Sequence, residues 1–221
     1  MGSYRNNYAR KVADTARFNT REAFAAACAA QRVNGDYLKL SETDHQGDRV
    51  RIANKHLTRD FIDSKFDIRE EDRAQAENVI LHFQGLTFKI LQGKVLSDFE
   101  TKAMECATCE EVGVFELAVI SSLPSCYIRA KARQDTDSRL RDTDGYIGNV
   151  GDKVDIYDFE IVRCRYSENW NTYFVTGITP DNKAVFFSYR DNIDVGAIVN
   201  LSGKVKAHKE NQTQLNYVKG I

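Results

Sequence analysis

The alternating pattern of residues 199–219 constrains the fold of this chain more than any other stretch. In its first half the residues of one parity are apolar or small and predict an inward face: Val199, Leu201, Gly203, Val205 and Ala207. Those of the other parity are polar and predict an outward face: Asn200, Ser202, Lys204, Lys206 and His208. A period of two is typical of a half-buried strand. After a polar turn at residues 209–211, Leu215 and Tyr217 alternate with Gln214 and Asn216, which predicts a β-hairpin with lysines and amides outside.

Strand-like runs also precede this hairpin, at residues 154–165, 172–178 and 185–189. With 199–208 and 213–218 they make about five strands joined by short turns. The period of the sequence therefore changes from helical to two-residue after position 145.

The first of these runs changes parity halfway along. Val154 and Ile156 have one parity, whereas Phe159 and Ile161 have the other. A one-residue bulge near Tyr157 would keep all four inward and coil the strand, as a small barrel requires. A long coiled first strand with a closing hairpin predicts an OB-fold, in which strands 2 and 3 and the 1–2 and 4–5 loops form the ligand face. An SH3-like barrel is the alternative.

The first two thirds of the chain carry helical patterns instead. Helices are predicted at residues 20–33, 67–84, 97–106, 112–121 and 125–140. The first has an alanine-rich run that follows a capping-box-like pair, Asn19 and Glu22, and ends at Gly35. The sequence thus predicts an α+β protein, with a mainly helical docking or oligomerisation region over residues 1–140 and an OB-fold-like barrel over residues 145–221.

Three of the remaining stretches are rich in polar residues. Residues 1–17 are predicted to be a basic arm or a capped first turn, and residues 38–55 a loop or short irregular pieces. Residues 135–145 contain almost no aromatic or aliphatic side chains and are predicted to be a linker or an exposed domain boundary.

Composition narrows the class of protein. The apolar runs are far shorter than the roughly 20 residues of a membrane span, and the N-terminus lacks the apolar core of a signal peptide. Five cysteines are an odd number, which fits reduced thiols in a cytosol better than a disulfide framework. A soluble cytoplasmic protein without membrane contact is expected. Because the net charge is −1, any nucleic-acid binding must come from a local patch.

About a third of the chain resembles the OB-type domain at the end of many bacteriophage and prophage proteins of replication and DNA-metabolism regions. The resemblance lies in VGDKVDIYDFEIVRCRY, ITPDNKAVFFSY and SGKVKAHKENQTQLNYVK. The matching positions of its V-K-x-H and Q-T-x-L elements are Gly203, Val205, Lys206, His208, Gln212, Thr213 and Leu215. The family's loop usually has an aromatic residue and a glycine where this chain has Glu210 and Asn211. The resemblance implies a phage-type accessory protein in the host cytoplasm, with single-stranded DNA or RNA and other phage or host proteins as partners.

Candidate contacts with a nucleic acid lie on the predicted barrel. The cations that could follow a phosphate backbone are Arg165, Lys204, Lys206, His208 and Lys209. The rings that could stack on unpaired bases are Trp170, Tyr173 and Phe187. Trp170 is the strongest of these, because it falls in the predicted 1–2 loop. Parity leaves open whether Tyr173 or Phe174 points outward.

Two other interpretations of these residues remain open. A basic strand face over an aromatic core can simply be a solvated surface. Residues 146–221 contain equal numbers of basic and acidic residues, and OB-folds also dock proteins, so the alternative function is a docking or host-takeover module that binds no nucleic acid.

Cys106 and Cys109 form a C-x-x-C pair. A structural zinc site needs two more ligands, which Cys126 and one of the histidines could supply, but no second pair with suitable spacing exists. A redox pair would open a helix after a strand, whereas this one closes a helical stretch and precedes two glutamates. Two thiols packed in helices are the prediction, without a metal.

No motif predicts an enzyme or a cofactor. Asp142 and Asp144 precede Gly145 as in a calcium loop, but the other ligands of such a loop are missing, so a turn is predicted. The sequence has no phosphate-binding loop of the G-x-x-x-x-G-K-[ST] type, no H-E-x-x-H and no nucleophile elbow.

Overall fold

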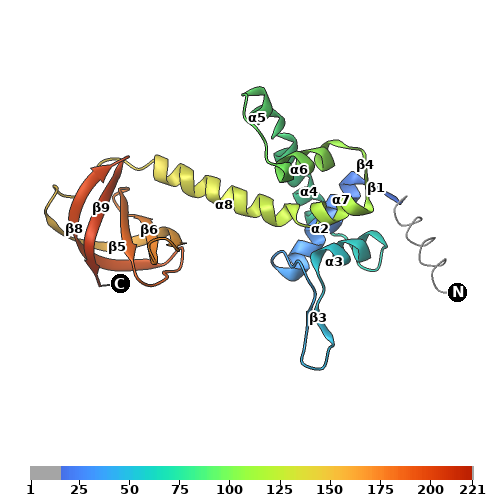
Figure 1. The fold of residues 1–221 in the computed structure, drawn as a ribbon, viewed down its shortest axis with the longest axis horizontal. Helices are drawn as coiled ribbons and strands as arrows, with labels where there is room; N and C mark the ends of the chain where they lie inside the picture. Colours follow the sequence, from blue (N-terminus) through green and yellow to red (C-terminus); the bar gives the residue numbers. More distant parts are fainter. Residues whose placement is uncertain (1–15, 221) are drawn as a thin grey trace. The chain divides into compact units, whose positions relative to one another are not determined.

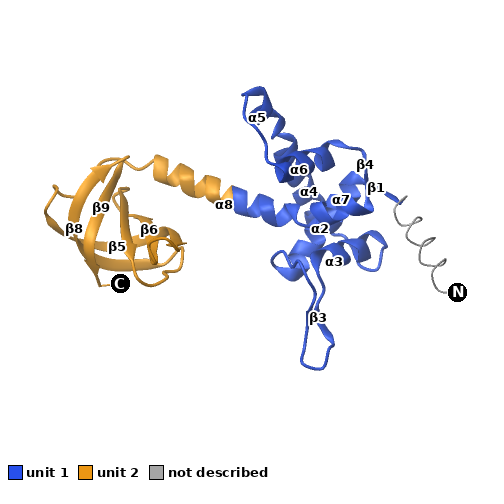
Figure 2. Cartoon of the chain, in the orientation of Figure 1, with its two compact units in different colours: residues 1–130 blue, residues 131–221 orange. Residues whose placement is uncertain are grey.

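The structure is a computed structural model that describes residues 16–220 of the chain. The chain divides into two compact units, residues 1–130 and residues 131–221, and each is described by itself (Figure 2). The first is mainly helical and the second contains the barrel, so the predicted α+β class is confirmed. The predicted arm at residues 1–17 lies almost wholly outside the described residues.

Helix α2 (Thr20–Asn34) is the centre of the helical unit. The Asn19 side chain accepts a hydrogen bond from the Glu22 N–H at 3.2 Å, and Gly35 ends the helix with a φ of 75°, which glycine adopts without strain. Every residue of the alanine run is buried. Because alanine side chains are small, other helices can approach α2 closely on several sides. The prediction for residues 20–33 is confirmed.

Two further helices extend the packing around α2. Helix α4 (Glu70–Gln84) packs on α2, and helix α6 (Asp98–Thr108) packs on α4. Helix α6 begins with a capping box, in which the Ser97 N–H donates to the Glu100 carboxylate at 3.0 Å. Both helices contribute to the main core of the unit, together with α2 and α7. The predictions at residues 67–84 and 97–106 are therefore confirmed, with shifted ends.

The predicted loop at residues 38–55 is wrong in part. It contains a small hairpin of β2 (Glu42–Thr43) and β3 (Arg49–Arg51), and it leads into helix α3 (Asn54–Ile62), which the sequence did not reveal. The buried Asn54 side chain accepts hydrogen bonds from the Leu38 N–H and the Asn34 amide, both at 2.8 Å. These bonds come from distant residues, and therefore local pattern does not show where α3 begins.

The other short elements complete the unit. They are β1 (Arg17–Asn19), α5 (Thr87–Leu91), β4 (Glu111–Gly113) and α7 (Val114–Ile120). Strands β1 and β4 pair antiparallel, so the helix predicted at residues 112–121 begins later than expected. Helix α5 was not predicted.

Helix α8 (Leu123–Arg141) crosses the division between the two units. It confirms the helix predicted at residues 125–140. Residues 135–141, predicted to belong to a linker, are part of this helix, and the non-helical connection to the barrel begins at Asp142. The low apolar content there reflects a solvent-exposed helix rather than an irregular segment.

The barrel is made of five strands in the positions that the two-residue period predicted. They are β5 (Lys153–Ser167), β6 (Thr172–Ile178), β7 (Ala184–Tyr189), β8 (Ile198–Lys209) and β9 (Gln212–Lys219). The strands close in the order β5-β6-β7-β9-β8. All pairs are antiparallel except β7 with β9. This closed five-stranded barrel is OB-fold-like, as predicted.

Strand β5 closes the barrel because it pairs along its first half with β8 and along its second half with β6. Its register shifts between Ile156 and Phe159, where Asp158 has a φ of 50°, and this is the predicted bulge near Tyr157. Gly177 on β6 allows the tight closure, since a Cβ there would lie 2.3 Å from the Phe159 ring. The core of the barrel is separate from that of the helical unit.

Candidate nucleic-acid interface

An aromatic pair lies on the outer face of strands β6 and β7. Phe174 and Phe186 are half-buried, and their ring centroids are 5.8 Å apart. They have the opposite parity to Val175 and Val185, which are fully buried in the barrel core. Strands 2 and 3 of an OB-fold carry its usual ligand face. These two rings are therefore the aromatic groups best placed to meet a ligand.

Two of the predicted stacking rings belong to the core instead. Phe187 is 1% exposed within the barrel, so its predicted role is wrong. Tyr173 is half-buried against the same core and packs on Tyr166 with ring centroids 5.1 Å apart. Each strand carries an aromatic doublet, of which one ring must point outward. The parity of the buried valines beside each doublet is the sequence signal that identifies Phe174 and Phe186.

Amides and a lysine continue this outer face across the next strands. Phe186 lies beside Gln214 in the parallel ladder of β7 and β9. The next outward residue of β9 is Asn216, which lies opposite Lys204 of β8. Lys204 in turn lies opposite Lys153 at the start of β5. With strands about 4.8 Å apart, the surface from the phenylalanines to the lysines is short enough for a few nucleotides to cover.

On the other side of the aromatic pair lies Arg165. It is exposed on β5, directly opposite Phe174 in the ladder of β5 and β6. The structure thus places this predicted cation beside the outward ring rather than beside the lysines of the hairpin. The outer face of the barrel consequently has a guanidinium at one side of its rings and lysines at the other.

A bulge in β8 changes the predicted face of the hairpin. The register of β8 and β9 shifts between Val205 and Ala207, so that Ala207 lies opposite the outward Gln214. His208 then lies opposite Thr213, which is fully buried. Parity alone placed Ala207 inside and His208 outside, and both predictions are wrong.

His208 is held at the end of the barrel by its neighbours. Its ring packs on Tyr146 with centroids 4.3 Å apart, and its Nδ1 is buried with no hydrogen-bond partner within residues 16–220. A half-buried imidazole in this position is poorly placed to follow a phosphate backbone. Lys206 and Lys209 remain exposed, Lys209 at the tip of the hairpin beside Gln212.

A second departure from alternation occurs near the end of β9. Tyr217 was predicted to point inward with Leu215, but it is exposed and has a φ of 57°, in the left-handed region. The register shifts between Ser202 and Lys204 on the partner strand at the same level. Val218 packs against the core in its place.

The β5–β6 loop carries Trp170, whose side chain is exposed. Its exposed fraction is 74%, and the loop is a tight turn in which Asn171 has a φ of 44°. The Tyr166 hydroxyl donates to Asn171 Oδ1 at 2.7 Å and holds the turn against β5. An indole this exposed, in the loop between strands 1 and 2, is free to stack on a ligand.

Ion pairs divide the basic residues of the barrel into two groups. Arg163, Lys183 and Arg190 pair with Asp137, Asp181 and Asp191. Six others form no ion pair within the described part of the chain: Lys153, Arg165, Lys204, Lys206, Lys209 and Lys219. The unpaired cations include four of the five predicted phosphate contacts, and they are the ones that a polyanion could engage without breaking an existing pair.

The end of α8 and the connection after it bind to the outside of the barrel. Arg139 forms a two-bond pair with Glu160, at 2.9 and 2.6 Å, and holds the pKa of that carboxyl below its usual range. Thr143 is buried, and its carbonyl accepts from the Asn211 side chain in the β8–β9 turn. Asn211 is one of the two positions that differ from the loop of the phage family, and here it has a structural contact.

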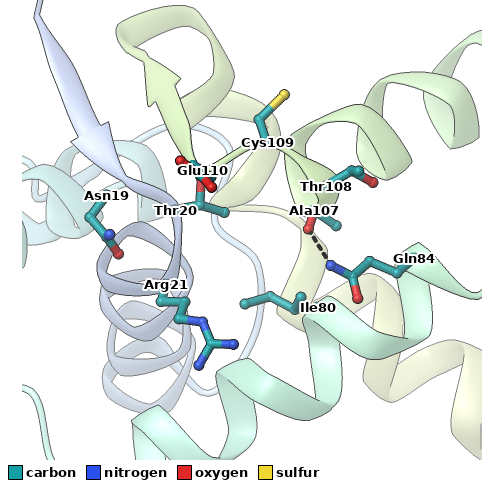
Figure 3. Close-up of a pocket in the computed structure, with 9 residues that line it drawn as sticks. All are labelled: Asn19, Thr20, Arg21, Ile80, Gln84, Ala107, Thr108, Cys109 and Glu110. Atoms are coloured by element: carbon teal, nitrogen blue, oxygen red, sulfur yellow. Dashed lines mark hydrogen bonds between the residues drawn. The ribbon is translucent and has the colours of Figure 1, made fainter.

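The helical unit has a pocket of its own, at the start of α2 and the end of α6 (Figure 3). Its volume is about 310 Å³. The Gln84 side chain donates to the Ala107 carbonyl at 2.8 Å, and the Thr20 N–H donates to the Glu110 carbonyl at 3.0 Å. Arg21, which also lines it, pairs with Glu77 at 3.0 Å. The buried Thr20 hydroxyl has no hydrogen-bond partner within the described residues, but the other groups named here already have partners, so the pocket offers less to a ligand than the barrel surface does.

The cysteine pair is only partly as predicted. Cys106 is buried in α6, and burial raises its pKa to about 11, so it is an unreactive packed thiol. Cys109 lies beyond the last residue of the helix and is exposed, which corrects the prediction for that thiol. No group of three or more His, Cys, Asp or Glu gathers as a metal site would require within residues 16–220.

A scan against protein-family models, a search of the curated proteins and a search of the solved structures each found no match to this chain. Among the residues that the structure describes, no helix is both long enough and apolar enough to span a membrane.

Proposed function

We propose that the barrel binds single-stranded nucleic acid across the outer face of β6, β7 and β9. The observation that carries the proposal is the outward pair Phe174 and Phe186, whose rings lie 5.8 Å apart between cations that form no ion pair within residues 16–220. Bases stack on the two rings and on Trp170, and the phosphates run toward Arg165 on one side and Lys204 on the other.

The chemistry of this face favours a single strand over a duplex. Stacking needs unpaired bases, because each ring must reach the π-face of a base. The amides of Gln214 and Asn216 can hydrogen-bond base edges or sugars without selecting one sequence. We infer binding of low sequence preference to DNA or RNA, in line with the phage-type accessory role that the resemblance suggests.

The experiment is a binding titration with labelled single-stranded and duplex oligonucleotides. Replacing Phe174 and Phe186 by Ala should weaken single-strand binding by about 1 to 3 kcal/mol for each base that loses its stack. Tyr157→Ala is the matched control, since that ring is exposed on the half of β5 that pairs with β8 rather than with β6. Equal losses in the control, or unchanged binding in the double variant, would contradict the proposal.

Salt dependence tests the cations separately. The logarithm of affinity should fall linearly with the logarithm of salt, with a slope of roughly −0.7 per phosphate neutralised on a single strand. Replacing Lys204 and Lys206 by Ala should flatten the slope. Lys183→Ala is the control. Because Lys183 already pairs with Asp181 at 2.7 Å, this substitution should leave the slope unchanged.

A second function rests on a different observation. The barrel sequence, residues 146–221, has as many acidic as basic residues, which suits a protein partner as well as a nucleic acid. In that case the unit is a docking module of a larger assembly. Absence of any oligonucleotide binding by the full chain at low salt would favour this function over the first.

A further inference from the structure

Helix α5 is an apolar element without a buried residue. Phe88, Ile90 and Leu91 make up most of this five-residue helix, yet all of them are exposed. Helix α5 is held in place by polar contacts instead: the Thr87 hydroxyl donates to the Gln84 carbonyl at 2.7 Å, and Lys89 pairs with Glu100 at 2.9 Å. Figure 1 shows α5 at an extremity of the helical unit. A helix this short gains little from its own hydrogen bonds, so its apolar side chains need a partner surface.

The exposed apolar side chains of α5, of the loop after it and of the start of α6 are together called the α5 patch. Its members are Phe88, Ile90, Leu91, Val95 and Phe99, with exposed fractions of 68%, 47%, 77%, 96% and 45%. Phe88 and Leu91 are three residues apart and share one side of the helix. The ion pair between Lys89 and Glu100 brings α5 against the first turn of α6, which carries Phe99. The patch therefore joins α5, the loop after it and the start of α6.

The patch is comparable in size to the largest apolar patch of a typical monomer, which often has a function. Fully exposed side chains of this kind present on the order of 150 to 200 Å² each, so the patch amounts to several hundred Å². The largest apolar patch on a monomer is usually about 300 to 600 Å² and often has a function. With its polar rim, such a patch approaches the roughly 800 Å² that each partner contributes to a standard interface.

Charges at the rim indicate which partner fits. Lys94 and Asp98 are exposed beside Val95 and form no ion pair within the described residues, and Lys89 and Glu100 lie nearby. The rim thus carries two charges of each sign. A nucleic acid or a strongly charged protein would require one sign, whereas a twofold contact requires a surface that complements itself.

We propose that the α5 patch is the contact between two copies of this chain in solution. A twofold axis through the patch covers Leu91 and Val95 of each copy with those of the other. It also brings Lys94 of each copy toward Asp98 of the other, so that two symmetry-related ion pairs form across the axis. This inference goes beyond the proposed function and does not depend on it, because none of its residues belongs to the barrel.

The first test measures the mass of the full chain by light scattering and sedimentation. At about 100 µM, well above the micromolar dissociation constants of weak interfaces of this size, the wild type should have about twice the monomer mass of 25.1 kDa. Leu91→Glu with Val95→Glu should halve that mass. Val50→Glu is the matched control, since Val50 is 65% exposed on the β2–β3 hairpin, and it should leave the dimer intact. A monomeric wild type, or a dimer that survives the double substitution, would overturn the proposal.

The second test uses the charges and keeps the patch apolar. Lys94→Glu should weaken the dimer, as should Asp98→Lys, because each places like charges in contact across the axis. The two together should restore dimerisation toward the wild-type level. Equal dissociation constants for all four proteins would show that the charges do not meet. Binding of the wild type to anionic lipid vesicles, lost in Leu91→Glu with Val95→Glu without any change in mass, would assign the patch to a membrane surface instead.

Discussion

The helical unit and the barrel form their hydrophobic cores in different ways. In the helical unit one alanine-rich helix, α2, is wrapped by α3, α4 and α7, and the repeating backbone hydrogen bonds of each helix lie within that helix. In the barrel every strand takes its hydrogen bonds from two neighbours, and the ladder closes on itself. The stability of the helical unit therefore depends on side-chain contacts between its elements, whereas the stability of the barrel depends on the close approach of its strands. It follows that the two units should fail through different kinds of substitution.

The largest effect is expected from a substitution that breaks a side-chain contact between two helices of the helical unit. The buried Asp72 carboxylate accepts two hydrogen bonds from Arg32, both at 2.8 Å, and one from the Arg69 N–H at 3.0 Å. Asp72→Ala leaves the Arg32 guanidinium with only its longer contact to Glu71, at 3.5 Å, and should cost about 3 kcal/mol. Hydrogen exchange should accelerate in residues 20–120 and stay unchanged in the barrel. Faster exchange in both units would show that they unfold together.

The barrel should instead be destabilised by a substitution that prevents the close approach of its strands. At Gly177 a Cβ would lie 2.3 Å from the Phe159 ring and 2.4 Å from the Glu160 carbonyl oxygen. Gly177→Ala should therefore destabilise the barrel by roughly 2 kcal/mol and leave the helices unaffected. Adding Phe159→Leu should recover part of the loss, because it removes the ring but not the carbonyl contact. The comparison is contradicted if Gly177→Ala changes the helical transition, measured by calorimetry, as much as the barrel transition.

A smaller effect concerns where the barrel unit begins. The sequence predicts that a fragment from residue 145 folds alone, but the structure adds contacts before that point. Asp142 O accepts from the Asn182 amide at 2.9 Å, and Arg139 pairs with Glu160. We expect residues 131–221 to be about 1 to 2 kcal/mol more stable than residues 145–221. Urea titrations of the two fragments measure the difference, and equal midpoints would show that the end of α8 contributes nothing.

The smallest effect sharpens the comparison through pH. Hydrogen bonds from the Ser97 N–H and from Lys89 lower the pKa of Glu100 from 4.5 to about 2. Because the folded pKa is depressed, this stabilisation is present above about pH 4.5 and is lost as the pH falls toward 2. Glu100→Gln should lower the melting temperature of the helical unit at pH 7, for a loss of about 1 kcal/mol, and the difference should vanish near pH 2. Glu105→Gln, which makes the same change at an exposed position of the same helix, is the control.

Sequence pattern predicted the elements in which one period runs uninterrupted. Helix α2 has caps at both ends and a continuous alanine run, and the five strands of the barrel alternate for most of their length. Helix α3 was missed because Asn54, which fixes its start, is bonded to residues far away in the sequence. Helix α5 was missed because an element without a buried residue leaves no periodic trace.

The strands that carry the candidate site could be predicted from the sequence, but the side chains that point outward from them could not. Period-two alternation assumes that a strand has no irregularity, and a bulge at Lys206 and Ala207 moved His208 off the outer face. In the doublets of β6 and β7 the sequence offered two rings for each outward position. The parity of Val175 and Val185 identifies the outward ring only when these valines are known to be buried, and the pairing of β6 with β7 and the closure of the barrel decide that.

The exposed position of Trp170 has a consequence for how this protein can be observed. It is the sole tryptophan of the chain, and it stands in the β5–β6 loop at the edge of the proposed interface. Its fluorescence therefore comes from one solvated indole at the place where a base would stack. Quenching on titration with an unlabelled oligonucleotide would report contact at that loop, and an acrylamide accessibility measurement would show whether the ligand covers it. The molecule carries an intrinsic optical probe of its own candidate site.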